Sequence, residues 1–247
     1  MTRIGLATFC ATALVLAAVP LAHAETIFVS KEKDNTITVI DGDTMETMDT
    51  IETSRRPRGI MLSPDNKELF VAAGDGDIID VIDTKTLKIT RQLESGPDPE
   101  LMDIDPDGKI IYIANEDDSM VTIMELASGE VLAEVPVGVE PEGMAVSPDN
   151  KLTAATSEST SMAHIIDNET YQLVANVLVD SRPREAKWTK DGKELWVSSE
   201  IGGTVSVIDP TTWEITDKIG FEVAGLRPEQ LQPVGMDFVK DESLMMV

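Results

Sequence analysis

The segment PEGMAVSPDNKLTAATSESTSMAHIIDNETYQLVANVLVDSR, residues 141–182, decides the fold, because the chain repeats its pattern every 42 residues. The markers of the repeat are an acidic residue after an apolar one, a hydroxyl residue three positions later, and a proline. They fall at Asp41, Asp83, Glu125, Asp167 and Asp209, at Thr44, Thr86, Ser128, Thr170 and Thr212, and at Pro57, Pro99, Pro141 and Pro183. Similarity at a fixed period near 40 residues is typical of repeat architectures, in which each unit buries its apolar face against the next.

Each unit has the pattern of four short strands separated by turn residues. Within the quoted segment we expect strands at 143–147, 152–157, 162–167 and 171–179, with turns of Pro, Asp and Asn chemistry between them. Four strands in a unit of this length predict an all-β fold, a β-propeller of four-stranded blades. A solenoid is the alternative, but its repeats are usually shorter.

The repeat units of this sequence do not add up to a whole number of blades. The chain opens on a second strand at 27–30 and ends on another at 245–247, with four complete units between them. A first strand at 235–239 could join the three N-terminal strands and make five blades. Alternatively, further units follow, and the ending in mid-strand favours this interpretation of a propeller that is truncated at its C-terminus.

The first 24 residues predict a cleaved export signal. Arg3 is followed by an apolar run at 4–19, and Ala22-His23-Ala24 is a small-x-small cleavage sequence. Residues 25–247 would then form a periplasmic or secreted propeller domain. An uncleaved anchor is the alternative, but the run is short for a membrane span, and no other segment is long and apolar enough.

The charge composition excludes some classes of binding partner. The chain has 20 basic and 45 acidic residues, a net charge of −25. Such a polyanion gains nothing from counterion release on nucleic acid, so we expect no nucleic-acid partner. Its field favours cations or a basic protein, although solubility alone is an alternative explanation.

The residues for common catalytic and metal chemistry are missing from the sequence. The only cysteine, Cys10, lies in the predicted signal, and there is no Cys-x-x-Cys-His or Gly-x-Ser-x-Gly. His164, the only histidine after cleavage, cannot by itself make a zinc site and is expected on a blade surface. Residues 103–108 match the start of a calcium loop but lack its closing glutamate, so we interpret them as a hairpin turn. We predict no catalytic residue, no metal and no cofactor.

The loops that lead into each first strand carry paired charges around a proline. They are Arg56 and Arg58, Asp98 and Glu100, Glu140 and Glu142, and Arg182 and Arg184. In a propeller these loops ring the central channel. They predict either a pocket in which arginine forks bind a zwitterionic or carboxylate ligand, or a set of inter-blade salt bridges. The oxygen-rich loops at 74–77, 115–118, 157–160 and 200–203 share this face and could hold calcium or simply be solvated.

The insertion at 220–232 breaks the repeat, since Pro233 follows Pro183 by 50 residues rather than 42. Long loops on a regular scaffold are often functional. Arg227 in this insertion is therefore a candidate contact residue of a docking loop or a cap on a ligand. A tolerated surface insertion is the alternative.

Several runs resemble the YVTN family of β-propeller repeats, namely 144–149, 111–115 and 205–209. Longer runs at 96–100, 114–118, 137–149 and 197–209 resemble a narrower group, the PQQ-dependent catabolism-associated β-propellers. The resemblance covers residues 25–247 and implies seven blades, whereas the chain holds little more than five units.

The resemblance implies an association with quinoprotein alcohol dehydrogenase systems rather than a defined chemistry. We expect a non-catalytic binding or scaffold protein whose partner is a periplasmic quinoprotein dehydrogenase, a cytochrome or a small metabolite. The alternative is a lactonase-like or quinoprotein-type enzyme with a metal or cofactor at the channel mouth. For that alternative, Asp98, Glu100, Glu140 and Glu142 are the only carboxylate cluster available.

Overall fold

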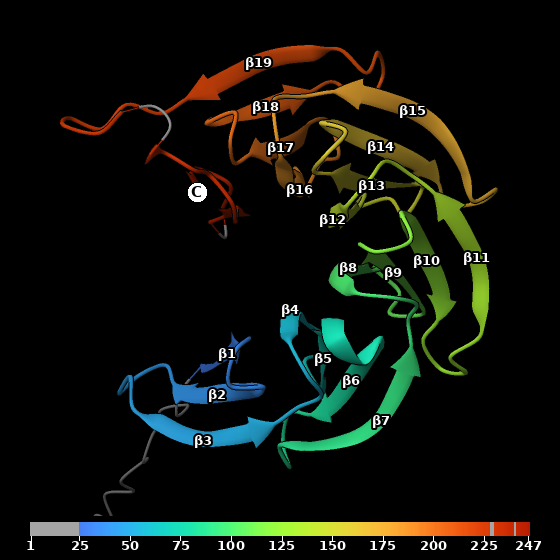
Figure 1. Ribbon diagram of the computed structural model, residues 1–247, viewed down its shortest axis with the longest axis vertical. Helices are drawn as coiled ribbons and strands as arrows, with labels where there is room; N and C mark the ends of the chain where they lie inside the picture. Colours follow the sequence, from blue (N-terminus) through green and yellow to red (C-terminus); the bar gives the residue numbers. More distant parts are fainter. Residues whose placement is uncertain (1–24, 228–229, 240) are drawn as a thin grey trace, which may run out of the picture.

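The computed structural model describes residues 25–227, 230–239 and 241–247, and arranges their strands in sheets around an open centre (Figure 1). The predicted export signal, residues 1–24, lies outside the described residues. We call the sheets blades 1 to 5 in chain order. Their strands are β1 (Thr26–Lys31), β2 (Thr36–Asp41) and β3 (Thr47–Glu52); β4 (Pro57–Leu62), β5 (Glu68–Ala73), β6 (Ile78–Asp83) and β7 (Lys88–Glu94); β8 (Pro99–Ile104), β9 (Ile110–Asn115), β10 (Met120–Glu125) and β11 (Val131–Pro136); β12 (Pro141–Val146), β13 (Leu152–Ser157), β14 (Met162–Asp167) and β15 (Gln172–Leu178); β16 (Pro183–Trp188), β17 (Leu195–Ser199), β18 (Thr204–Ile208) and β19 (Ile215–Gly220).

Each four-stranded blade is an antiparallel meander that runs outward from the centre. β4, β8, β12 and β16 lie innermost, and β7, β11, β15 and β19 form the rim (Figure 1). In blade 4 the strands match the ranges expected from the sequence to within two residues. The prediction of an all-β propeller of four-stranded blades is therefore confirmed. Among the described residues, no helix is long and apolar enough to span a membrane.

The hydrophobic core lies between the blades rather than within any one of them. Residues of blades 2 and 3 form one cluster around Phe70 and Ile111, and the other adjacent pairs of blades have clusters of their own. Phe70 and Tyr112, the aromatic residues of two second strands, are 0% and 2% exposed and pack in the clusters between blades. Because both faces of the inner strands lose water, stacking supplies the main stabilisation, about 25 cal/mol per Å² of buried apolar surface.

The two ends of the arc do not join. Blade 1 has three strands, and the last hairpin pairs β20 (Asp237–Phe238) with β21 (Met245–Met246). Among the described strands, β1 pairs only with β2, so the interpretation in which 235–239 completes the first blade is wrong. The reason is that the end of the chain packs on blade 5, where the rings of Trp196 and Phe238 lie 5.5 Å apart, edge to face. Figure 1 shows the open side between blade 1 and the C-terminal hairpin.

The rim of every blade is irregular. The pairing of the last two strands shifts register by one residue in all five blades, which places a bulge in each outermost strand. Three of the bulge residues, Met48, Leu132 and Val174, are exposed apolar side chains. A bulge twists the edge and interrupts its row of free backbone groups, so an edge of this kind is a poor template for another strand.

Candidate functional site

The charged loops begin with a backbone conformation that side chains other than glycine rarely adopt. Arg56, Asp98, Glu140 and Arg182 have φ of 60°, 49°, 57° and 59°, although each precedes a proline, a position that favours extended backbone. In return, their carbonyl groups accept hydrogen bonds of 2.8–3.0 Å from the N–H groups of residues 74, 116, 158 and 200. The left-handed residue thus ties each entry loop to the loop between the second and third strands of its blade.

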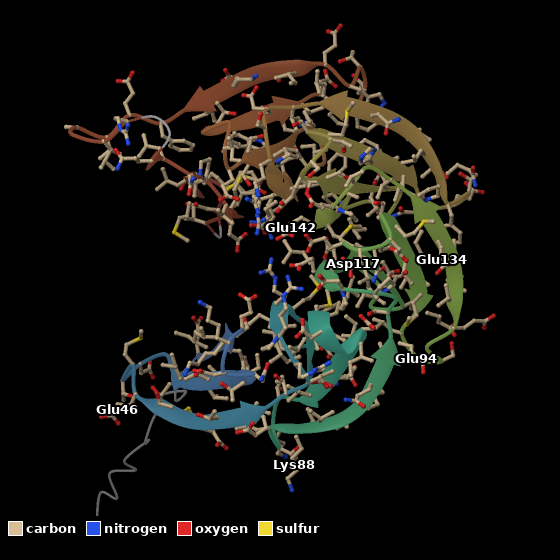
Figure 2. The ribbon with its side chains drawn as sticks, viewed as in Figure 1. Glu46, Lys88, Glu94, Asp117, Glu134 and Glu142 are labelled. Atoms are coloured by element: carbon tan, nitrogen blue, oxygen red, sulfur yellow. The ribbon has the colours of Figure 1, made fainter. Side chains whose placement is uncertain are left out.

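A bulge then directs the next charged side chains toward the centre. Pairing of the first and second strands skips two residues after each proline, between Pro57 and Ile60, Pro99 and Met102, Pro141 and Met144, and Pro183 and Ala186. Arg58, Glu100, Glu142 and Arg184 are the first residues of these irregular steps. Bulges commonly re-aim a side chain in this way. Figure 2 shows Glu142 at the inner margin of its blade, toward the open centre.

On the side of blades 2 and 3, two arginines bind the carboxylates of the neighbouring blade. Arg56 Nη1 lies 2.5 Å from Asp98, and its Nη2 lies 3.0 Å from Glu100. Arg58 Nε lies 2.5 Å from Glu100, and its Nη2 extends to Glu142 of blade 4 at 3.5 Å. Glu32 of blade 1 lies 3.4 Å from both arginines. This half of the network therefore connects four successive blades.

On the side of blades 4 and 5, Arg182 and Arg184 make the matching contacts. Arg184 Nη2 lies 2.8 Å from Glu142, and its Nη1 bonds Glu158. Arg182 Nε lies 2.8 Å from Glu158 and 3.3 Å from Glu200. Glu142 is thus shared by arginines from both directions. The interpretation of these loops as inter-blade salt bridges accounts for all four arginines.

One glycine makes room for the network. Gly74 occupies the repeat position that is glutamate at 32, 116, 158 and 200. A Cβ on Gly74 would lie 2.4 Å from Asp98 Oδ1 and 2.9 Å from Arg56 Nη1. The missing side chain therefore leaves the space that the Arg56–Asp98 pair fills.

Burial shifts the pKa of the two innermost carboxyl groups. Glu100 and Glu142 are 0% and 4% exposed. Burial, with a contribution from Glu142, raises the pKa of Glu100 to about 8 against the pull of Arg58. Burial also raises the pKa of Glu142, although Arg184 and Arg58 oppose this shift. The mouth of the channel thus carries carboxyl groups whose charged form is held at a cost in desolvation.

The structure brings together seven of the nine residues singled out in the sequence, and leaves two apart. Glu140 accepts a hydrogen bond from the Ser159 hydroxyl instead of an arginine. Arg227 is exposed in the insertion, where its backbone bonds Gln230. Sequence reasoning placed the partners Glu32, Glu116, Glu158 and Glu200 in solvated or calcium-binding loops or left them out. Their 42-residue spacing was the signal that could have placed them in the network.

The carboxylates that most resemble a metal site are occupied by an arginine. Asp98, Glu100 and Glu116 bring one oxygen each within 4.8 Å of one another. The guanidinium of Arg56 reaches all three, at 2.5, 3.0 and 3.9 Å. A side-chain cation therefore lies where the enzyme alternative would need a metal ion. The turn at 103–108 is a hairpin, in which Asp105 accepts the N–H groups of Lys109 and Ile110.

His164 is not on a blade surface, and that prediction is wrong. It is 6% exposed. Its Nε2 accepts a hydrogen bond of 2.9 Å from the N–H of Gly138, and its Nδ1 lies 2.5 Å from Asn176 Oδ1. Burial lowers the pKa of His164, although Asn176 opposes the shift. The other residues at this repeat position are small or polar, so the sequence indicated an exposed position. In the structure the position faces the linker from the preceding blade.

Residues of the network line a partly open pocket of about 380 Å³. Four carboxylates and two guanidiniums line it, together with the apolar side chains of Leu101 and Val234. The charged lining residues are Glu32, Glu100, Glu142, Glu185, Arg58 and Arg184. Charged groups of both signs on a partly apolar wall can hold a small polar molecule.

The fold, four-stranded antiparallel blades arranged around a common centre, defines the chain as a β-propeller protein. The family model described as YNCE-like beta-propeller matches residues 3–124. Among solved structures, Kuenenia stuttgartiensis hydrazine synthase is similar at 18% identity, with a TM-score of 0.79 over 95% of this chain and 76% of that chain. A likeness at this identity concerns the fold alone. No curated protein matches the chain. The closer resemblance to the PQQ-associated group stays a prediction.

Proposed function

We propose that the chain is a non-catalytic, periplasmic binding or scaffold propeller that serves a PQQ-dependent alcohol oxidation system. The observation that supports the non-catalytic, scaffold interpretation is the use of the channel-face arginines. All four are bound by carboxylates of adjacent blades, so none is left as a free fork for a substrate anion. The association with PQQ-dependent catabolism and the periplasmic location rest on the sequence resemblance and the predicted export signal.

The charge of the surface favours a basic protein as the partner. Blade 3, residues 99–136, contains ten acidic residues and one lysine. Three of the acidic side chains are exposed: Asp117 and Asp118 in the loop between β9 and β10, and Glu134 on the outermost strand β11. Figure 2 shows Asp117 and Glu134 on this part of the arc. Complementary charges accelerate and orient encounters between proteins, as a mobile electron carrier requires. We therefore expect a basic periplasmic cytochrome or dehydrogenase to contact blade 3.

The test is a binding titration with a basic c-type cytochrome at two salt concentrations. Binding should weaken at least tenfold between low and about 0.5 M salt, because exposed charges are screened within a few ångströms there. The triple variant Asp117→Asn, Asp118→Asn, Glu134→Gln should weaken binding at low salt. A matched variant with the same loss of charge on the opposite turns of this blade, Asp107→Asn, Glu125→Gln, Glu130→Gln, should bind like the wild type. Binding that does not depend on salt would contradict the proposal.

A further inference from the structure

Three exposed apolar side chains break the polar pattern of the repeat on the face that carries the arginine network. Val139, Leu178 and Ile201 are 51%, 65% and 61% exposed. At the same repeat positions the other blades have charged residues, serine, proline or glycine. The equivalents are Arg55, Pro97 and Ser181 for Val139; Glu52, Glu94, Pro136 and Gly220 for Leu178; and Lys33, Asp75, Asp117 and Ser159 for Ile201. One exposed apolar residue is ordinary, but three such departures in neighbouring segments indicate a contact surface.

Backbone hydrogen bonds join the segments that carry these side chains. In the loop between β13 and β14, the N–H of Ser159 donates to the carbonyl of Val139 at 3.3 Å. The carbonyl of Ser161 in the same loop accepts the N–H of Val179, next to the end of β15, at 3.0 Å. The loop that contains Ile201 donates to the linker after β15 in the same way, at 2.9 Å. The three side chains therefore lie along one row of loops on blades 4 and 5, which Figure 1 shows side by side.

An acidic loop continues this row on blade 3. The N–H of Val137, in the linker that carries Val139, donates at 3.0 Å to the carbonyl of Ser119 in the loop between β9 and β10. Asp117 and Asp118 in that loop are exposed, and Figure 2 shows Asp117 on this blade. The surface thus presents negative charge directly beside apolar side chains. It complements a protein whose lysines surround an apolar contact area.

A second copy of this chain is a poor occupant of the same surface. Each copy would bring its own acidic loop and a net charge of −25. Like charges brought together at an interface oppose association, so self-association through this surface is disfavoured. The charge therefore selects a basic partner.

We propose that this surface docks a basic protein, whose lysine side chains contact Asp117 and Asp118 and whose adjacent apolar area packs on Val139, Leu178 and Ile201. The inference rests on the proposed function and names the contact that holds its protein partner. Charge accelerates and orients the encounter, whereas the apolar contact sets how slowly the partner leaves. The two contributions are separable, because salt screens only the first of them.

The experiment measures the rates at which a basic c-type cytochrome binds to and leaves the immobilised whole chain, at low and at about 0.5 M salt. The triple variant Val139→Ser, Leu178→Gln, Ile201→Ser removes the apolar side chains without changing the charge. Serine already occurs at two of these repeat positions, in Ser181 and Ser159. We expect the variant to weaken binding at least tenfold through faster dissociation, and by the same factor at both salt concentrations.

Two controls accompany the triple variant. Met48→Gln, Ile89→Thr, Val174→Thr removes as many exposed apolar side chains from the outermost strands and should bind like the wild type. Ile201→Ser alone, a single change in an exposed loop, should weaken binding severalfold while circular dichroism reports an intact sheet. The neutralised acidic loop, Asp117→Asn with Asp118→Asn, should instead slow association, and only at low salt.

The proposal is overturned if the triple variant binds like the wild type, if its effect disappears at high salt, or if the control on the outermost strands weakens binding equally. It is also overturned if sedimentation shows that the wild type self-associates and the triple variant does not, because a second copy would then cover the surface. If the triple variant keeps the full salt-dependent affinity, only this inference fails and the proposed function stands. If the cytochrome does not bind at all, the proposed partner and this contact fail together. Salt-independent binding that the triple variant weakens would contradict the role of charge and support the apolar contact.

Discussion

The side chain of His164 fixes the linker that enters its blade. It accepts the N–H of Gly138 in the segment that connects blade 3 to blade 4, and Asn176 orients its ring. Asp80 does the same work in blade 2, where it accepts both the N–H and the hydroxyl of Ser54. Ser206, at the same repeat position in blade 5, is fully buried, and among the described residues its hydroxyl has no hydrogen-bond partner. The same repeat position therefore holds the entering linker by hydrogen bonds in some blades and makes no such bond in blade 5.

We expect His164→Ala to lower the free energy of unfolding by about 1–3 kcal/mol, because it leaves the buried N–H of Gly138 without an acceptor. Urea denaturation followed by circular dichroism measures this change. Ser206→Ala is the matched control at the equivalent position and should change stability little, since it removes no bond. Equal losses in the two variants would show that burial alone matters at this position.

Glycines set how closely the inner strands of neighbouring blades approach. Gly143 of β12 packs against β16, and a Cβ on it would lie 2.2 Å from the carbonyl oxygen of Arg184 and 3.0 Å from the Cα of Glu185. Gly59 of β4 has the same relation to Glu100 in β8. Because these neighbours are backbone atoms, they can yield only if a whole strand moves. The channel-facing bulges depend on this close approach.

Gly143→Ala should therefore destabilise the protein by about 1–3 kcal/mol, the usual effect of overpacking. It should also separate β12 from β16 and so loosen the Arg184–Glu142 contact. Gly220→Ala is the control, since a Cβ there has no atom within 4 Å. Thermal and urea unfolding of the two variants provide the measurement. An unchanged midpoint for Gly143→Ala would refute the close approach of the strands.

The sequence predicts the strands well and the pairing of charges poorly, for physical reasons. Strand positions follow from local alternation and turn residues, which the 42-residue repeat displays five times. The prolines also located the charged loops at the channel. Which acid binds which arginine depends on left-handed residues such as Arg56 and on bulges such as that after Pro57, which no local pattern reveals. The same limit applies to β20, which pairs with β21 and whose Phe238 contacts Trp196 of blade 5.

The burial of Glu100 within the arginine network makes the stability of the protein sensitive to pH. Glu100 is surrounded by Arg56, Arg58, Glu116 and Glu142. Its pKa is about 8 in the folded chain and near 4.5 when exposed. Between these values the folded state binds more protons than the unfolded state, so this group lowers stability as the pH rises from 4.5 to 8.

Glu100→Gln should remove that dependence. The stability of the wild type relative to the variant should fall steadily between pH 5 and 8, as measured by urea unfolding at several pH values. Glu140→Gln, which lies on the same face, should run parallel to the wild type. If the wild type gained stability relative to Glu100→Gln as the pH rose, ion pairing with the arginines would outweigh burial at this position.

The bulge in each outermost strand has a consequence for concentrated solutions. The outermost strand of each of the five blades is an exposed edge strand. Regular edge strands can pair with those of another molecule, and repeated pairing of this kind leads to fibres. Here each outermost strand has a bulge at the equivalent position. Three of these bulges carry exposed apolar side chains, Met48, Leu132 and Val174. Neighbouring molecules can therefore touch through these side chains and part again, while their backbones stay out of register for growth.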